Sequence, residues 1–122
     1  MHKALLLLTL TAFWPAARSA ELPQSALWEI DQLLGALGSS NCRFNRNGTW
    51  YSASDAQAHL TKKYEYLRKK RLLESAEDFI TGAGTESSRS GQPYQVQCGQ
   101  EDAVPSAVWL GEALRRLRKM RA

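Results

Sequence analysis

A helical repeat of apolar residues opens the folded part of the chain. From Leu22 to Leu37 they recur at steps of three and four, a spacing that places them on one helical face. Pro23 suits the first helical turn and Gly38 suits the C-terminal end. The members of this face are Leu22, Ala26, Leu27, Ile30, Leu33, Leu34 and Leu37. The pattern therefore predicts a core helix.

A second helix is predicted from Ser54 to about Leu73. Ser54 and Gln57 match a capping box, in which two side chains bond to free amides of the first turn. The apolar face holds Ala56, Leu60, Tyr64 and Leu67, and the face toward solvent or a ligand holds His59, Lys62, Lys63, Tyr66, Lys69 and Lys70. This helix should therefore have one core face and one basic face.

Two further segments carry helix signals. Ser75 caps a short segment with Phe79 and Ile80 inward, which ends near Gly82 and Gly84. The last helix starts near Pro105-Ser106, with Ala107, Leu110, Leu114 and Leu117 on its apolar face and Arg115, Arg116, Arg118, Lys119 and Arg121 in its last turns. Because positive charge complements the dipole at a helix C-terminus, we interpret these basic residues as helix-stabilising.

Alternation and turn residues predict strands at two places. Residues 94–98 alternate strictly, as in a strand with one buried face. Asn47-Gly48 favours a tight hairpin turn. The strand residues predicted to face inward are Tyr94, Val96 and Cys98. Together the elements predict an α+β fold, with about four helices on a small three-stranded antiparallel sheet.

The register of the hairpin decides which aromatic side chain faces outward. With a two-residue loop, Phe44 and Tyr51 share one face, and Trp50 lies with Arg43 on the other. If Gly48 instead forms a bulge after a type I turn, Phe44 and Trp50 share a face, and Tyr51 faces outward. The sequence leaves both alternatives open.

The first twenty residues have the layout of a secretory signal peptide. The apolar run from Ala4 to Trp14 is about eleven residues long, short of the roughly 20 that span a bilayer. We expect cleavage after Ser19 or Ala20, which leaves a single domain at 21–122 with no membrane span.

Removal of this segment changes the charge of the chain. Lys3 and Arg18 lie within it, which leaves fourteen of the sixteen basic residues against twelve acidic ones. An exported protein meets lipid headgroups, lipopolysaccharide phosphates and cell-wall carboxylates. We therefore predict no nucleic-acid partner.

Cys42 and Cys98 are expected to form a disulfide, because an exported chain meets an oxidising environment. Closure of the 56-residue separation would contribute roughly 4 kcal/mol in the chain-entropy model. Two thiols and His59 lack a fourth ligand for zinc. We predict no metal site and no cofactor.

Several short motifs occur in a specific order. They are Cys-x-Phe-x-Arg-Asn-Gly from Cys42, Ala-x-x-His-Leu from Ala56, Ala-Glu-Asp-Phe-Ile from Ala76 and Ser-Gly-x-Pro-Tyr-x-Val-x-Cys from Ser90. With this set the chain resembles a family of small exported bacterial proteins of unknown function. The resemblance runs from about Cys42 to Cys98 and extends to Trp109-Leu110. It implies a periplasmic location in a Gram-negative bacterium, and it implies no activity.

The sequence does not contain a convincing catalytic set. Ser90 precedes Gly91 but lacks the glycine two residues before it that a nucleophile elbow requires. His59 is the one histidine after the leader, and Lys62 and Lys63 favour its neutral form. We therefore expect a protein without enzymatic activity.

The polar loop from Gly82 to Gln92 is the kind of surface segment that often binds partners. We predict an envelope-associated binding protein whose partner is an unknown envelope protein or glycan. The alternative is an inhibitor of a cell-wall-degrading enzyme that acts through Ser88 to Tyr94, because Ser90 to Tyr94 resembles the inhibitory loop of periplasmic lysozyme inhibitors. A hydrolase that uses His59 is the third hypothesis. The candidate binding residues are Arg43, Trp50, Tyr51, His59, Arg89 and Ser90.

Overall fold

The computed structural model describes residues 21–122, together with residues 4 and 9. The predicted signal peptide and its cleavage site therefore lie outside the described residues, apart from these two positions. In residues 21–122, no helix is both long and apolar enough to cross a bilayer.

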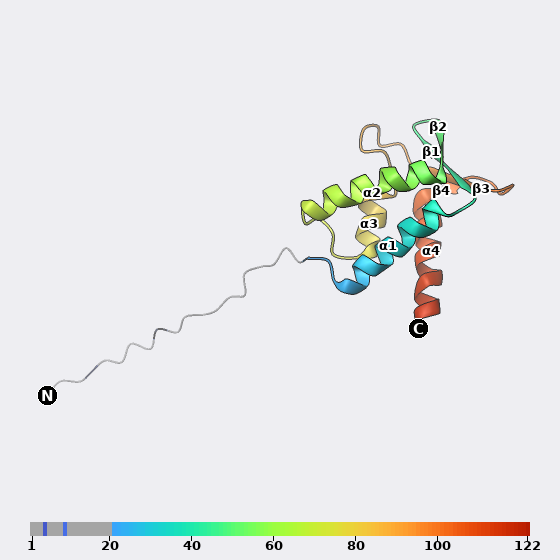
Figure 1. Cartoon of the computed structure of the whole chain (residues 1–122). Coiled ribbons are helices and arrows are strands. Elements are labelled where there is room, and N and C mark those ends of the chain that lie inside the picture. Colours follow the sequence, from blue (N-terminus) through green and yellow to red (C-terminus); the bar gives the residue numbers. More distant parts are fainter. Residues whose placement is uncertain (1–3, 5–8, 10–20) are drawn as a thin grey trace.

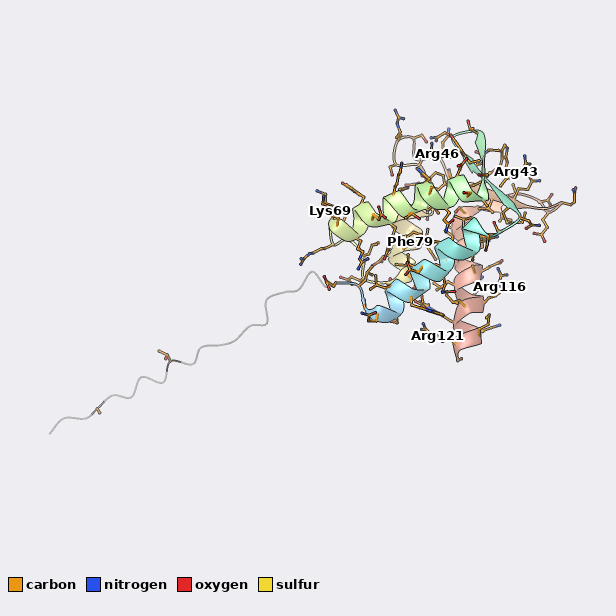
Figure 2. The ribbon with its side chains drawn as sticks, viewed as in Figure 1. Arg43, Arg46, Lys69, Phe79, Arg116 and Arg121 are labelled. Carbon is orange, nitrogen blue, oxygen red and sulfur yellow. A yellow bond between two sulfur atoms is a disulfide. The ribbon has the colours of Figure 1, made fainter. Side chains whose placement is uncertain are left out.

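Four helices form the larger part of the fold (Figure 1). They are α1 (Gln24–Gly38), α2 (Ala53–Lys69), α3 (Ala76–Ala83) and α4 (Ser106–Arg121). The helices pack against one another, and the sheet lies at the end of the molecule where α2 begins. Phe79 of α3 is fully buried and points into the space between the helices (Figure 2).

The sheet has four strands in the described part of the chain. They are β1 (Cys42–Arg46), β2 (Thr49–Ser52), β3 (Gln95–Cys98) and β4 (Val104–Pro105), in the order β2-β1-β3-β4. All neighbours are antiparallel. The α+β prediction is confirmed, but the prediction of three strands was wrong. The fourth strand is two residues long and includes a proline, so it has no alternation by which it could be recognised.

The hairpin adopts the register with a two-residue loop. Arg46 pairs with Thr49, and Phe44 pairs with Tyr51. Asn47 and Gly48 have φ angles of 53° and 84°, which is why this dipeptide suits the turn. Tyr51 thus lies on the face of Phe44, and Trp50 lies on the opposite face.

The start and end of α2 differ from the prediction. Ser52 is the N-cap, since its side chain accepts a 3.1 Å hydrogen bond from the backbone N–H of Asp55. Gln57, the predicted partner of Ser54, instead lies against Gly38, where an added Cβ would come within 2.0 Å of the Gln57 side chain. A larger residue at position 38 would therefore require the end of the Gln57 side chain to move. The helix ends at Lys69, several residues before Leu73.

Two of the predicted local features are confirmed. The Ser75 side chain caps α3 by accepting a 3.1 Å hydrogen bond from the Asp78 N–H. Cys42 and Cys98 form a disulfide between directly paired residues of β1 and β3. The disulfide thus joins the two central strands of the sheet.

Candidate functional site

The six predicted binding residues do not form one patch. Arg43 and Trp50 lie on the outer face of the sheet, and Tyr51 and His59 lie on the other side with Arg46. Figure 2 shows Arg43 and Arg46 at the sheet end of the molecule, in different positions relative to α2. The alternation of β1 explains the separation, because residues 43 and 46 of a strand point to opposite faces.

On the outer face, Arg43 covers Trp50. The guanidinium lies 5.0 Å from the centre of the indole ring, and its Nη2 donates a 2.6 Å hydrogen bond to Oε1 of Gln97. Trp50 is 37% exposed. The Arg43 side chain therefore has its partners, Trp50 and Gln97, within the sheet itself.

On the other side, Arg46 contacts both Tyr51 and His59. Its Nη2 lies 3.4 Å from the Tyr51 hydroxyl, and its guanidinium carbon lies 4.9 Å from the centre of the tyrosine ring. Its Nη1 lies 2.7 Å from Nδ1 of His59 and 3.3 Å from Nε2. Since a guanidinium can only donate, the closer Nδ1 accepts, and the proton of the neutral imidazole is assigned to Nε2.

The Tyr94 hydroxyl accepts a hydrogen bond from this protonated nitrogen. Nε2 of His59 donates to the Tyr94 hydroxyl at 3.0 Å, and Nζ of Lys63 donates to the same oxygen at 3.1 Å. The tyrosine ring is 1% exposed and packs against Phe44 at 4.8 Å between ring centres. With two donors on its oxygen, the Tyr94 hydroxyl keeps its own proton for an acceptor, and no described residue provides one.

The polar loop is tied to the hairpin through Asn47. The Asn47 side chain donates a 3.2 Å hydrogen bond to Oγ of Ser87 and accepts a 2.5 Å hydrogen bond from Oγ of Ser90. Ser87 is only 5% exposed, although the loop was predicted from its polar composition to lie on the surface. These contacts place Ser88 and Arg89 beside Arg46 and Lys63.

Three adjoining hollows meet at His59, and we call them together the His59 groove. The loop hollow, about 210 Å³, is lined by Arg46, Asn47, His59, Lys63, Ser87, Ser88, Arg89 and Tyr94. The helix hollow, about 310 Å³, is lined by His59, Lys62, Lys63, Tyr66, Leu67, Gly82 and Ser88. The hairpin hollow, about 240 Å³, is lined by Phe44, Arg46, Tyr51, Asp55, Ala56, Ala58, His59 and Lys62.

The His59 groove is rich in cations without paired carboxylates. Within residues 21–122, none of the side chains of Arg46, Lys62, Lys63 and Arg89 forms an ion pair. Asp55 is the one acidic residue among those that line the three hollows in the described chain. The groove therefore has an excess of positive charge.

The electrostatic environment of the groove disfavours further protonation. Burial, followed by the charges of Arg46 and two lysines, lowers the pKa of His59 to about 4. Burial also lowers the pKa of Lys63, an effect that Glu86 opposes and Arg46 strengthens. His59 is thus neutral at pH 7 and forms hydrogen bonds with both Arg46 and Tyr94.

Within residues 21–122, the structure contains no cluster of three or more potential metal-ligating side chains.

Comparison with known proteins concerns most of the chain. The model of a protein family of unknown function, DUF5329, matches residues 24–118. The chain belongs to this family. No curated protein and no solved structure matches it. The predicted membership of a family of unknown function is confirmed, and the exported bacterial origin stays a prediction.

The DUF5329 region includes every residue that lines the His59 groove.

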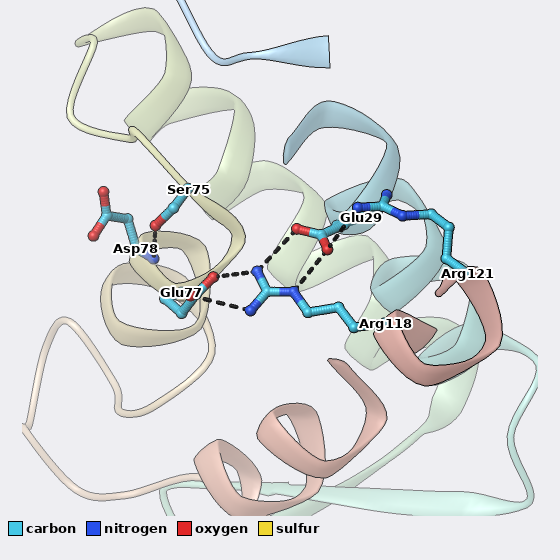
Figure 3. A network of polar contacts seen from close by, with 6 residues as sticks. All are labelled: Glu29, Ser75, Glu77, Asp78, Arg118 and Arg121. Carbon is cyan, nitrogen blue, oxygen red and sulfur yellow. Dashed lines mark hydrogen bonds and ion pairs between the residues drawn. The ribbon is translucent and has the colours of Figure 1, made fainter. Parts of the chain in front are cut away.

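The same region contains a network of charged side chains that was not predicted from the sequence (Figure 3). Glu29, which is 4% exposed, accepts hydrogen bonds from Nε and Nη2 of Arg118 at 2.8 and 3.1 Å. The same arginine bonds to both oxygens of Glu77, at 2.7 and 3.3 Å. We predicted that Arg118 complements the helix dipole, whereas the structure shows it joining three helices.

The groove also contains residues that the prediction omitted. Arg46, Asn47, Lys63 and Tyr94 belong to it but were not among the six candidates. Arg46 and Tyr94 could have been predicted to lie together, because the alternation of each strand places both on the same sheet face as Phe44. Ser90 is bonded to Asn47 and does not line the three hollows.

Proposed function

We propose that this DUF5329 protein is a non-catalytic binding protein, and that its ligand is an anion held in the His59 groove. The observation that carries the proposal is the set of four cations around one neutral histidine, none of which forms an ion pair with another described residue. Lys62 and Arg89 are exposed, but Arg46 and Lys63 are half-buried. A cation that is partly withdrawn from water is costly unless an opposite charge accompanies it. A bound anion would supply that charge.

The hydrogen bonds of the groove support the same ligand. Arg46 and Lys63 are held in place by Tyr51, His59 and Tyr94, so they need little reorganisation when an anion arrives. The free hydroxyl proton of Tyr94 adds a neutral donor. Fixed donors lower the entropic cost of binding.

The contacts of His59 support binding over catalysis. Both of its ring nitrogens are occupied, by Arg46 and by Tyr94. A general base needs a free nitrogen within hydrogen-bond reach of the proton that it removes. The hydroxyls of Ser87 and Ser90 bond to Asn47 instead of the imidazole.

The geometry gives less support to the inhibitor hypothesis. An inhibitory loop from Ser88 to Tyr94 would present its side chains to the partner, and residues 88–93 are exposed. Tyr94, however, is 1% exposed and contributes to the core. The disulfide is compatible with an exported protein. We retain the periplasm as the proposed location, where lipid headgroups, lipopolysaccharide phosphates and wall polymers carry anionic groups.

Isothermal titration calorimetry with inorganic phosphate tests the proposal. Arg46→Gln removes a groove cation, and we expect it to weaken phosphate binding by about tenfold, corresponding to about 1.4 kcal/mol. The matched control is Arg116→Gln, which removes an exposed charge from α4 outside the groove and should leave the affinity within about twofold. Absence of phosphate binding by the unmodified protein, or equal losses in both variants, would contradict the proposal.

A further inference from the structure

We infer that the ligand of the His59 groove is a soluble amphipathic phosphate, with its phosphate in the loop hollow and its apolar group in the helix hollow. This inference rests on the proposed function and adds the chemical class of the ligand. It follows from the different composition of two hollows that share His59, Lys63 and Ser88.

The loop hollow presents donors that suit a phosphate. Three cations line it, from the hairpin, from α2 and from the polar loop, and the Tyr94 hydroxyl adds a fourth donor. Arginine and lysine side chains bind phosphate oxygens through charge-assisted hydrogen bonds. A carboxylate offers two oxygens and one charge, whereas a phosphate monoester offers three terminal oxygens and up to two charges. The phosphate therefore uses more of these donors. The cations are Arg46, Lys63 and Arg89.

The helix hollow differs in having apolar walls between α2 and α3. Leu67 is partly buried and packs against the core, and Tyr66 is 60% exposed. Gly82 of α3 lets Leu67 approach that helix closely, because an added Cβ would lie only 3.0 Å from its Cδ1. An apolar group placed here would cover surface that is exposed in the free protein, which is favourable.

The two hollows lie in contact along α2. Lys63 lines both, and its ammonium bonds to the Tyr94 hydroxyl and to the Glu86 carbonyl at 3.1 and 2.9 Å. A free phosphate ion would fill the charged end and leave the apolar end empty. A molecule with a phosphate and a short apolar group would use both. The small volumes, about 210 and 310 Å³, favour a soluble ligand over a lipid that stays in a bilayer.

Titration calorimetry with hexyl phosphate, inorganic phosphate and heptanoate tests the inference. We expect hexyl phosphate to bind at least tenfold more tightly than inorganic phosphate, because burial of a few methylene groups has this effect. Heptanoate, with a similar chain and a carboxylate, should bind at least fivefold more weakly than hexyl phosphate. Equal affinities of hexyl phosphate and heptanoate would overturn the assignment of a phosphate.

Two variants locate the apolar group. Tyr66→Ser alters an exposed side chain of the helix hollow, and Gly82→Ala places a methyl group against Leu67. Each should reduce the preference for hexyl phosphate over inorganic phosphate at least threefold and leave phosphate affinity unchanged. Arg46→Gln should weaken the binding of both ligands.

The outcomes separate this inference from the proposed function. If hexyl phosphate binds no more tightly than inorganic phosphate, the inference is overturned and the anion-binding function stands. If neither ligand binds, both fail. Binding to vesicles that contain phosphatidic acid, lost in Arg46→Gln, would identify a membrane source and contradict a soluble ligand. No such vesicle binding is expected.

Discussion

Two arginines of this protein lie in opposite electrostatic surroundings. Arg118 bonds to two carboxylates, Glu29 and Glu77, from two other helices. Arg46 bonds to a neutral imidazole and a phenol, and its neighbouring cations lack ion pairs within residues 21–122. A cation that is neutralised inside the protein can stabilise the fold. One that is not neutralised can attract a ligand.

The pKa shifts in the two regions reflect this difference. Hydrogen bonding to Arg118 lowers the pKa of Glu29 below its ordinary value, and the pKa of Arg118 is raised mainly by Glu29 and then by Glu77. Each charge there favours the other. In the His59 groove, burial and neighbouring cations lower the pKa of His59 to about 4, so additional positive charge is disfavoured.

The largest expected effect is the loss of stability in Arg118→Ala. This substitution leaves Glu29 buried without its main partner, and removal of one member of a buried pair costs several kcal/mol. Because the Arg118 side chain is 44% exposed, we expect a loss of about 2 to 4 kcal/mol in the free energy of unfolding, measured by urea denaturation.

The matched control for Arg118→Ala is Arg115→Ala in the same helix. Arg115 pairs with Glu112 at 3.7 Å, and both side chains are more than half exposed. We expect a loss below about 0.5 kcal/mol. A double variant, Glu29→Met with Arg118→Met, should recover much of the stability, because apolar groups can replace a buried ion pair. Equal losses for Arg118→Ala and Arg115→Ala would remove the distinction between the network and an ordinary surface pair.

A smaller effect is expected in the pH dependence of stability. Between pH 6.5 and 4 the unfolded chain binds a proton at His59 that the folded chain resists, so the free energy of unfolding falls as the pH falls through this window. Above pH 6.5 both states are neutral at this residue, and His59 contributes no pH dependence. After allowance for solvent screening, the change is roughly 1 to 2 kcal/mol.

His59→Gln isolates this contribution. Urea denaturation at several pH values should show a shallower acid loss in the variant than in the unmodified protein, since glutamine does not titrate. The acid sensitivity that comes from Glu29 and Glu77, whose pKa values are lowered first by hydrogen bonds to Arg118, lies in both proteins and cancels. Identical pH profiles between 6.5 and 4 would show that His59 is not held neutral.

The sequence predicted the local features of the fold more accurately than its long-range contacts. The inward position of Tyr94 and the Ser75 cap each depend on a short pattern, and both are confirmed. The disulfide is also confirmed although its cysteines lie 56 positions apart, because it was predicted from the oxidising environment of an exported chain. The two-residue hairpin was one of two registers that remained open. The cap of α2 was misplaced because Ser52 and Ser54 are both suitable caps, and the turn geometry selects the first.

The candidate site was predicted only in part, because its residues are brought together from distant parts of the chain. His59 was identified because histidine is rare in this chain, whereas its partner Tyr94 lies 35 positions away along the chain. The bond between Glu29 and Arg118 joins residues 89 positions apart. Such pairs depend on how the helices and strands pack, which no local spacing encodes.

The most direct test of anion binding at the His59 groove is a phosphate titration followed by proton–nitrogen NMR of the backbone and the His59 ring. We expect shifts to concentrate at Arg46, His59, Lys63 and residues 87–94, with a saturating concentration dependence. Residues around Glu29 and Arg118 should not shift, because their charges are already neutralised within the protein. Shifts centred on the basic end of α4, or spread evenly over all basic residues, would contradict the account.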